Sequence, residues 1–147
     1  MRLVKATADE LPLLAPLFDL YRQFYHQRPN PEGGLSFLRD RISRNESVLF
    51  LALDNQNNGL GFTQLYPSFS SVSMKRLWIL NDLFVAEDAR HQGVAEALIR
   101  RCEAYGRETN SKGLVLETAT DNIPAQTLYR KLGWNKEEEF DRYYINF

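Results

Sequence analysis

The sequence predicts an α/β fold: one domain over residues 1–147, with a mixed, mostly antiparallel sheet of about seven strands and about four flanking helices. Three strand-like runs follow one another between Val48 and Val85, which is typical of an antiparallel meander. After Val85, helical and strand-like segments alternate, which predicts a right-handed crossover between parallel strands. The chain has 147 residues, of which 44% are hydrophobic, so it is long enough for one core and short for two.

The first elements predicted are a strand and two helices. Residues 3–6 (LVKA) predict a short strand. Thr7 and Glu10 stand at the spacing of a capping box, and the apolar residues that follow keep helical spacing as far as Tyr25. A loop rich in proline and glycine comes next, and residues 35–45 then predict a second helix.

The expected meander consists of residues 48–53 (VLFLAL), 59–66 (GLGFTQLY) and 76–85 (RLWILNDLFV). The turn-rich stretch DNQNNG separates the first two runs. A polar loop over residues 67–75 separates the second and third. Short connections of this kind favour antiparallel neighbours.

The second half begins with a long amphipathic helix. It is expected to cover Ala95 to Glu108 and to be followed by an apolar strand over residues 113–119. A further helix is predicted from about Pro124 to Leu132. Two last strands, residues 134–140 and 142–147, would complete the sheet.

Composition excludes several classes of partner. The formal net charge is −1, whereas binding to nucleic acid or to an acidic membrane surface needs a basic excess. No apolar run approaches the roughly 20 residues of a membrane span. Cys102 is the only cysteine, which favours a reducing, cytoplasmic location. With His26 and His91 as the only histidines, and no second ligand one helical turn away, no metal site is expected.

The stretch RHQGVAEALIRR, residues 90–101, predicts a local anion site. A helix that starts after a glycine-bearing turn presents free N–H groups and the positive end of its dipole. Gly93 allows close approach of a ligand, Ala95 is small, and Arg90 adds a positive charge, so we expect a phosphate there. The alternative is that Gly93 is only a turn residue and Arg90 a solvated side chain. The stock motifs for nucleoside triphosphates and nicotinamide dinucleotides are absent.

Two segments in register resemble the GNAT superfamily of acetyl-CoA-dependent N-acyltransferases. That family has [RQ]-x-x-G-x-[GA] after its fourth strand and N-x-x-A-x-x-[LF]-Y-x-[KR]-x-G on a later helix. The chain matches strongly over residues 77–134 and loosely in its whole element order. The matching residues are Arg90, Gly93 and Ala95 in the first motif and Asn122, Ala125, Leu128, Tyr129, Lys131 and Gly133 in the second.

The resemblance implies where acetyl-CoA would bind. The pantetheine arm would add to the fourth strand like a further strand, and the fourth and fifth strands would splay into a V with the thioester at its vertex. Asn122 and Ala125 would line the other side of the arm, and Lys131 belongs to the same cofactor-binding set. The strand residues that would bind the arm are Leu83, Phe84 and Val85, and the amides that would wrap the pyrophosphate are those of His91, Gln92, Gly93, Val94, Ala95 and Glu96.

Amide formation from a thioester defines the catalytic groups that are needed. A protonated amine cannot attack, so a base must remove a proton, and the departing thiolate needs an acid. Tyr129 is the expected acid, with a core aromatic as the alternative reading. Asp82, Glu117 or water alone is the expected base. The alternative for Asp82 is an ion pair with an arginine.

The strand region also resembles the small-amine branch of that superfamily, which includes polyamine, diamine and thialysine acetyltransferases. Asn81 stands where that branch has a glutamate, while Asp82 is kept and is expected to attract an ammonium group. A primary amine, by direct attack in a ternary complex, is therefore the expected acceptor. The aromatic residues that could wall its pocket, or simply belong to the core, are Tyr21, Tyr25, Tyr66 and Phe69.

Two other functions stay open. One is a protein lysine or N-terminal acetyltransferase, and the other is an acyl-CoA sensor without turnover. A homodimer is also expected, because the alternating apolar residues Tyr143, Ile145 and Phe147 would otherwise leave an exposed edge strand.

Overall fold

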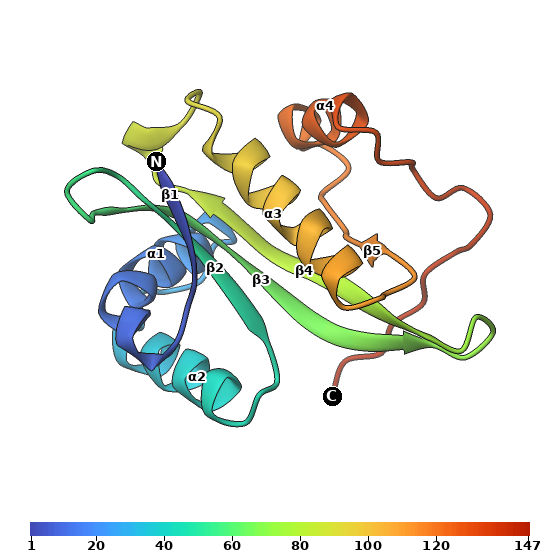
Figure 1. Cartoon of the computed structure of the whole chain (residues 1–147), viewed down its shortest axis with the longest axis horizontal. Coiled ribbons are helices and arrows are strands. Elements are labelled where there is room, and N and C mark those ends of the chain that lie inside the picture. The colour runs from blue at the N-terminus through green and yellow to red at the C-terminus, as the bar shows by residue number, and fades with distance from the viewer. The chain divides into compact units, whose positions relative to one another are not determined.

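A computed structural model describes all residues from Met1 to Phe147, in two compact units, Met1–Leu116 and Glu117–Phe147. Figure 1 shows the elements in chain order. The strands are β1 (Arg2–Lys5), β2 (Val48–Leu53), β3 (Gly59–Ser70), β4 (Lys75–Val85) and β5 (Leu114–Val115). The helices are α1 (Leu11–Phe24), α2 (Pro31–Ser43), α3 (Val94–Glu108) and α4 (Ile123–Lys131), with short 3₁₀ turns η1 (Ala8–Glu10) and η2 (Glu87–Ala89).

The sheet has five strands in the order β1-β2-β3-β4-β5. The meander β2-β3-β4 is antiparallel, as predicted, and β5 lies parallel to β4. The α/β class, the mixed sheet and the four helices are therefore confirmed. The predicted count of about seven strands is wrong, because the chain after Gly133 forms no strand.

The helix starts follow from local capping. The capping box predicted at Thr7 and Glu10 is present, with both reciprocal hydrogen bonds. The second helix, however, begins at Pro31 instead of Leu35. Its N-cap is Asn30, whose side-chain oxygen accepts from the Gly33 N–H at 3.0 Å, and a proline suits the first helical position. No helix is both long and apolar enough to cross a membrane.

Helices lie on both faces of the sheet. α1 and α2 cover one face, where Leu14, Leu38 and Phe62 are fully buried in one cluster. α3 covers the other face, where the Tyr105 ring packs against Phe50 at 5.6 Å. Figure 1 shows α1 and α2 together on one side and α3 on the other. Because both faces are covered, β2 is buried along its whole length.

A β-bulge in β4 changes which face its side chains occupy. Gln64 pairs with Asp82 and Leu65 pairs with Leu80, so Asn81 is an extra residue without a partner on β3. Before the bulge, Trp78 packs on Tyr105 of α3, at 5.3 Å between ring centroids. After the bulge, the even-numbered residues face α1: the Phe84 ring lies 6.4 Å from that of Tyr21.

The hairpin between β3 and β4 is longer than predicted. Pro67 to Ser70 continue β3 instead of forming a loop, and only residues 71–74 form the turn. The Arg76 guanidinium lies over the Phe69 ring at 4.9 Å and over the Trp78 ring at 5.1 Å. The contact with Phe69 crosses from β4 to β3 and extends the pairing beyond the apolar run that predicted the strand.

The second unit contains α4 and the C-terminal segment. α4 runs from Ile123 to Lys131, close to its predicted bounds. The predicted strands 134–140 and 142–147 are wrong, because the segment has no strand partner and four consecutive charged residues, 136–139, interrupt its apolar pattern. The apolar side chains of the last residues are exposed, with Tyr143 at 89%. The predicted strand 113–119 is also reduced, to Leu114–Val115.

Candidate functional site

Asp82 is the centre of a polar cluster on the α1 side of the sheet. Its side chain is buried, with 3% of the residue exposed. The Gln64 side-chain N–H donates to Asp82 Oδ2 at 2.5 Å, and the Asn81 side-chain N–H donates to Oδ1 at 2.8 Å. The Tyr21 hydroxyl also bonds to this carboxylate and lies 3.4 Å from the Asn81 carbonyl oxygen. Asp82 is therefore held by three side chains that carry no charge.

Burial controls the protonation of this cluster. Desolvation raises the pKa of Asp82, and the hydrogen bonds from Asn81, Gln64 and Tyr21 only partly oppose it. Burial, together with the nearby Asp82 charge, also raises the pKa of Tyr21. Burial and Asp82 raise the pKa of Tyr66 to about 12.

The ion pair considered for Asp82 is not present. None of the salt bridges in the structure involves Asp82, and the groups that hydrogen-bond to it are two amides and a phenol. A buried carboxylate without a cationic partner is unusual, since buried charges are normally paired. The negative charge of Asp82 is therefore not balanced by a cation of the protein, and a bound positive charge would stabilise it.

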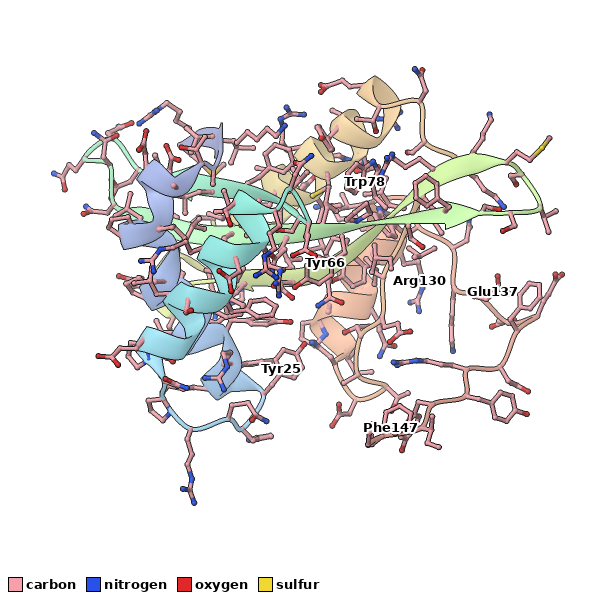
Figure 2. The ribbon with its side chains drawn as sticks, turned by 90° about the horizontal axis from the view of Figure 1, so that it is seen from below. Tyr25, Tyr66, Trp78, Arg130, Glu137 and Phe147 are labelled. Atoms are coloured by element: carbon pink, nitrogen blue, oxygen red, sulfur yellow. The ribbon has the colours of Figure 1, made fainter.

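Three of the four predicted wall residues lie near this carboxylate. The Asp82 charge acts on the pKa of both Tyr21 and Tyr66, and the Tyr25 ring packs edge-on to the Tyr21 ring at 5.2 Å. Figure 2 shows Tyr25 at the end of α1 and Tyr66 on β3, where α1 and α2 cover the sheet. Phe69 is separate, because it pairs with Arg76 near the hairpin turn.

Sequence reasoning missed Gln64. It is fully buried, and its side-chain oxygen has no hydrogen-bond partner. A signal was present: Thr63 and Gln64 are consecutive polar residues inside the otherwise apolar first part of the strand, residues 59–65. Thr63 points to α3, where Cys102 Sγ lies 3.7 Å from its hydroxyl, so Gln64 must point to the opposite face.

The turn before α3 has the features expected of an anion site. His91 and Gly93 both have left-handed backbone conformations, with φ of 61° and 79°. A side-chain carbon added at Gly93 would meet nothing within 4 Å, so the space beside its Cα is open. No side chain caps α3, and the N–H groups of Val94 and Ala95 donate to no group of the chain. Together these amides and the helix dipole favour a negative charge.

Arg90 is not simply solvated. Its Nε donates to the Val85 carbonyl oxygen at 3.1 Å, and its guanidinium lies 5.7 Å from the centre of the Phe84 ring. These contacts hold the positive charge between the end of β4 and the turn.

The end of β4 has a free edge for hydrogen bonding. Pairing with β5 stops at Ile79, whereas pairing with β3 continues to Val85. Ala86 donates to the Leu60 carbonyl oxygen at 2.8 Å, so the alternation of an antiparallel ladder directs the peptide groups of Leu83 and Val85 away from β3. An early end of the parallel ladder is what a splay between β4 and β5 requires.

The remaining predicted residues belong to the second unit. Asn122 caps α4 by accepting from the Ala125 N–H at 3.3 Å. Ala125 and Tyr129 lie one helical turn apart on the same face, the Tyr129 ring packs on Trp134 at 5.9 Å, and Lys131 is in the last turn.

Glu117, the alternative base, also lies in this unit. It is 65% exposed and forms an ion pair with Arg142. It is therefore paired and in contact with solvent, in contrast to Asp82, which is buried and has no cationic partner.

One open cavity of about 370 Å³ lies beside the turn before α3. Its lining includes Gln92 and Val94, on either side of Gly93, and the carboxylates Asp54 and Asp88. The two carboxylates make the cavity itself unfavourable for a phosphate, so the anion site is placed at the free N–H groups of the turn and not in this cavity. No group of three His, Cys, Asp or Glu side chains suited to a metal ion occurs in the structure.

The chain is similar to known acetyltransferases. The model of the acetyltransferase (GNAT) family matches residues 14–134. An uncharacterized N-acetyltransferase, YhfO of Bacillus subtilis, is 40% identical over 146 residues, which cover 99% of this chain and 97% of that protein. A crystal structure of a probable acetyltransferase has a TM-score of 0.95 at 47% identity and covers 100% of this chain and 98% of its own. An aminoglycoside N-acetyltransferase in complex with CoA, at 17% identity, has the same fold with a TM-score of 0.81 and covers 99% and 95% of the two chains.

Proposed function

The chain belongs to the acetyltransferase (GNAT) family, and from this membership we propose that it transfers an acetyl group from acetyl-CoA to the nitrogen of a small primary amine. The observation that carries the choice of acceptor is Asp82, a buried carboxylate with no cationic partner. A primary ammonium supplies the missing positive charge and can donate to the carboxylate.

Support for acetyl-CoA as the donor comes from the turn before α3. The open space at Gly93 and the undonated N–H groups of Val94 and Ala95 suit a pyrophosphate, and Arg90 adds a positive charge beside them. The outward peptide groups of Leu83 and the outward N–H of Val85 suit a pantetheine arm, while the Val85 carbonyl oxygen accepts from Arg90. The solved relative that holds CoA has the same fold.

The proposed reaction is direct attack in a ternary complex. Asp82 binds the ammonium and accepts one of its protons, and the neutral amine then forms a bond to the acetyl carbonyl carbon. The bond between that carbon and sulfur breaks, and the Tyr129 hydroxyl protonates the thiolate, which leaves as free CoA. The second proton of the new amide nitrogen restores the Tyr129 hydroxyl, and Asp82 releases its proton to solvent. Because the first motif lies in one unit and Tyr129 in the other, the proposal requires residues 1–147 to act as one domain.

Release of free thiol from acetyl-CoA tests the function. A panel of primary amines should support release, whereas peptides with a free N-terminus or a lysine should not. Release only with peptides would favour a protein acetyltransferase, and coenzyme binding without release with any acceptor would favour an acyl-CoA sensor.

Gly93→Val should abolish coenzyme binding. The valine side chain would fill the open space beside the α3 N-terminus and would be strained at a φ of 79°. Binding is measured by calorimetry with CoA, and thermal melting monitors the fold. Gly113→Val, where the added atoms also meet nothing, is the control and should bind CoA normally. Unchanged CoA affinity in Gly93→Val would remove the proposed site.

Asp82→Asn should raise the amine KM about tenfold or more and remove the acidic limb of the pH profile. Desolvation raises the pKa of Asp82, so the carboxylate protonates, and amine turnover falls, at a higher pH than for an ordinary aspartate. Asp141→Asn, at an exposed carboxylate of the C-terminal segment, should leave the profile unchanged. An acidic limb that persists in Asp82→Asn would show that Asp82 is structural.

Tyr129→Phe should lower kcat by about 100-fold or more, because a positioned acid typically contributes at least that factor. Coenzyme affinity and thermal stability should remain close to those of the wild type. Tyr105→Phe, which removes a hydroxyl from the packed ring on α3, should retain full kcat. Full kcat in Tyr129→Phe would mean that water or the ammonium itself protonates the thiolate.

The proposal includes a homodimer in the cytoplasm. The support is the exposed apolar C-terminal segment, with Tyr143 at 89% and Ile145 at 76%, and the single buried Cys102 without a disulfide partner. Light scattering at micromolar concentration should give twice the monomer mass, and a deletion of residues 143–147 should give the monomer. A monomeric wild type would contradict the dimer, and recovery in the membrane fraction of cells would contradict the location.

A further inference from the structure

We propose that Gln64 determines acceptor specificity: its side-chain carbonyl oxygen accepts a hydrogen bond from the ammonium group that Asp82 binds. The pair would thereby select a primary ammonium over its N-methylated forms. This inference rests on the proposed function and assigns a residue that the sequence motifs do not contain.

The first observation is an unsatisfied atom. Gln64 is fully buried, and its Oε1 has no hydrogen-bond partner. A buried carbonyl oxygen without a partner costs stability, so native structures contain few of them. The other buried side-chain atom of this kind, Ser47 Oγ, is not part of the cluster around Asp82.

The second observation is the orientation of the amide. The Gln64 Nε2 group donates to Asp82 Oδ2. Exchanging the oxygen and nitrogen positions would break this bond and place the amide oxygen against a carboxylate oxygen, with no hydrogen between them. The oxygen is therefore left as the acceptor.

The cluster lacks hydrogen-bond donors. Asp82 offers up to four acceptor sites, and Gln64 Oε1 offers two. The donors from Gln64, Asn81 and Tyr21 all reach Asp82, and none of them reaches Gln64 Oε1. A primary ammonium brings three N–H groups and a positive charge. One N–H can reach Asp82 and a second Gln64, and the third remains free. Each N-methyl group removes one donor and adds bulk at a buried site.

A ligand would reach Asp82 and Gln64 by passing Tyr21 and Tyr66. Tyr66 is only partly buried, although it is bonded to Gln64 and close to Asp82. Tyr21, also partly buried, covers the carboxylate from α1. Partly exposed side chains change rotamer rapidly, so a shift of Tyr66 opens a path to Gln64. The two rings then flank the cation, which aromatic faces favour.

The test compares Gln64→Met and Gln64→Glu with the wild type. Both substitutions remove the Nε2 donor to Asp82. Methionine keeps the length of the side chain and also removes the acceptor, whereas glutamate keeps an acceptor at the same place, so the difference between the two variants reports on the acceptor. For a primary amine, kcat/KM should fall about tenfold or more in Gln64→Met, while its N-methyl derivative loses little. The preference for the primary amine should therefore collapse in Gln64→Met and persist in Gln64→Glu.

A binding measurement separates this role from a structural one. With CoA present, the primary amine should raise the thermal midpoint of the wild type and of Gln64→Glu more than the N-methyl amine does. In Gln64→Met the two amines should give equal shifts. The control is Gln23→Met, because Gln23 also donates to a buried carboxylate, that of Asp19 at 3.0 Å, but is itself exposed. It should discriminate between the amines as the wild type does.

Each of the remaining outcomes contradicts the role of Gln64, the proposed function, or both. If Gln64→Met keeps the wild-type preference between the two amines, the assignment is overturned, and Gln64 only orients Asp82 or holds a buried water. If the wild type releases thiol with amines but shows no preference, the assignment fails and the proposed function stands. If no amine shifts the midpoint of the wild type or supports release, both fail.

Discussion

The extra residue in β4, Asn81, determines which face of the sheet Asp82 occupies. Without it, Asp82 would point to the same face as Trp78 and meet the apolar surface of α3. With it, Asp82 points to α1 and meets Gln64, Asn81 and Tyr21, which all hydrogen-bond to it. The same shift lets Phe84 join the core beneath α1. One inserted residue thus brings the carboxylate, its donors and the aromatic rings together.

This arrangement lowers the stability of the folded protein. A buried carboxylate held only by neutral donors is penalised by desolvation, and an unsatisfied amide oxygen beside it adds to the cost. The rest of the first unit compensates, because the fully buried strand β2 and the helices on both faces of the sheet supply a large apolar core. Such local costs are characteristic of sites that bind a ligand rather than of packing alone.

Segments with strong local signals could be predicted from the sequence. The meander from Val48 to Val85, the long helix after Gly93 and the capping box at Thr7 depend on periodicity and on neighbours in the chain. The C-terminal strands could not, because a strand depends on a partner that the pattern of Tyr143 to Phe147 does not reveal. Asp82 was found through its motif, and Gln64 was missed because its role depends on the register between β3 and β4.

The pKa of Asp82 is the most direct test of this account. Carbon-13 NMR of the side-chain carboxyl, assigned by comparison with Asp82→Asn, follows its titration in the protein without ligands. Burial without a cationic partner predicts a pKa above the value of about 3.9 for an unperturbed aspartate. Addition of a primary amine that the enzyme acetylates should lower it, because a bound ammonium favours the carboxylate. A pKa at or below the ordinary value without ligand would show that Asp82 is solvated or already paired, and would contradict the account.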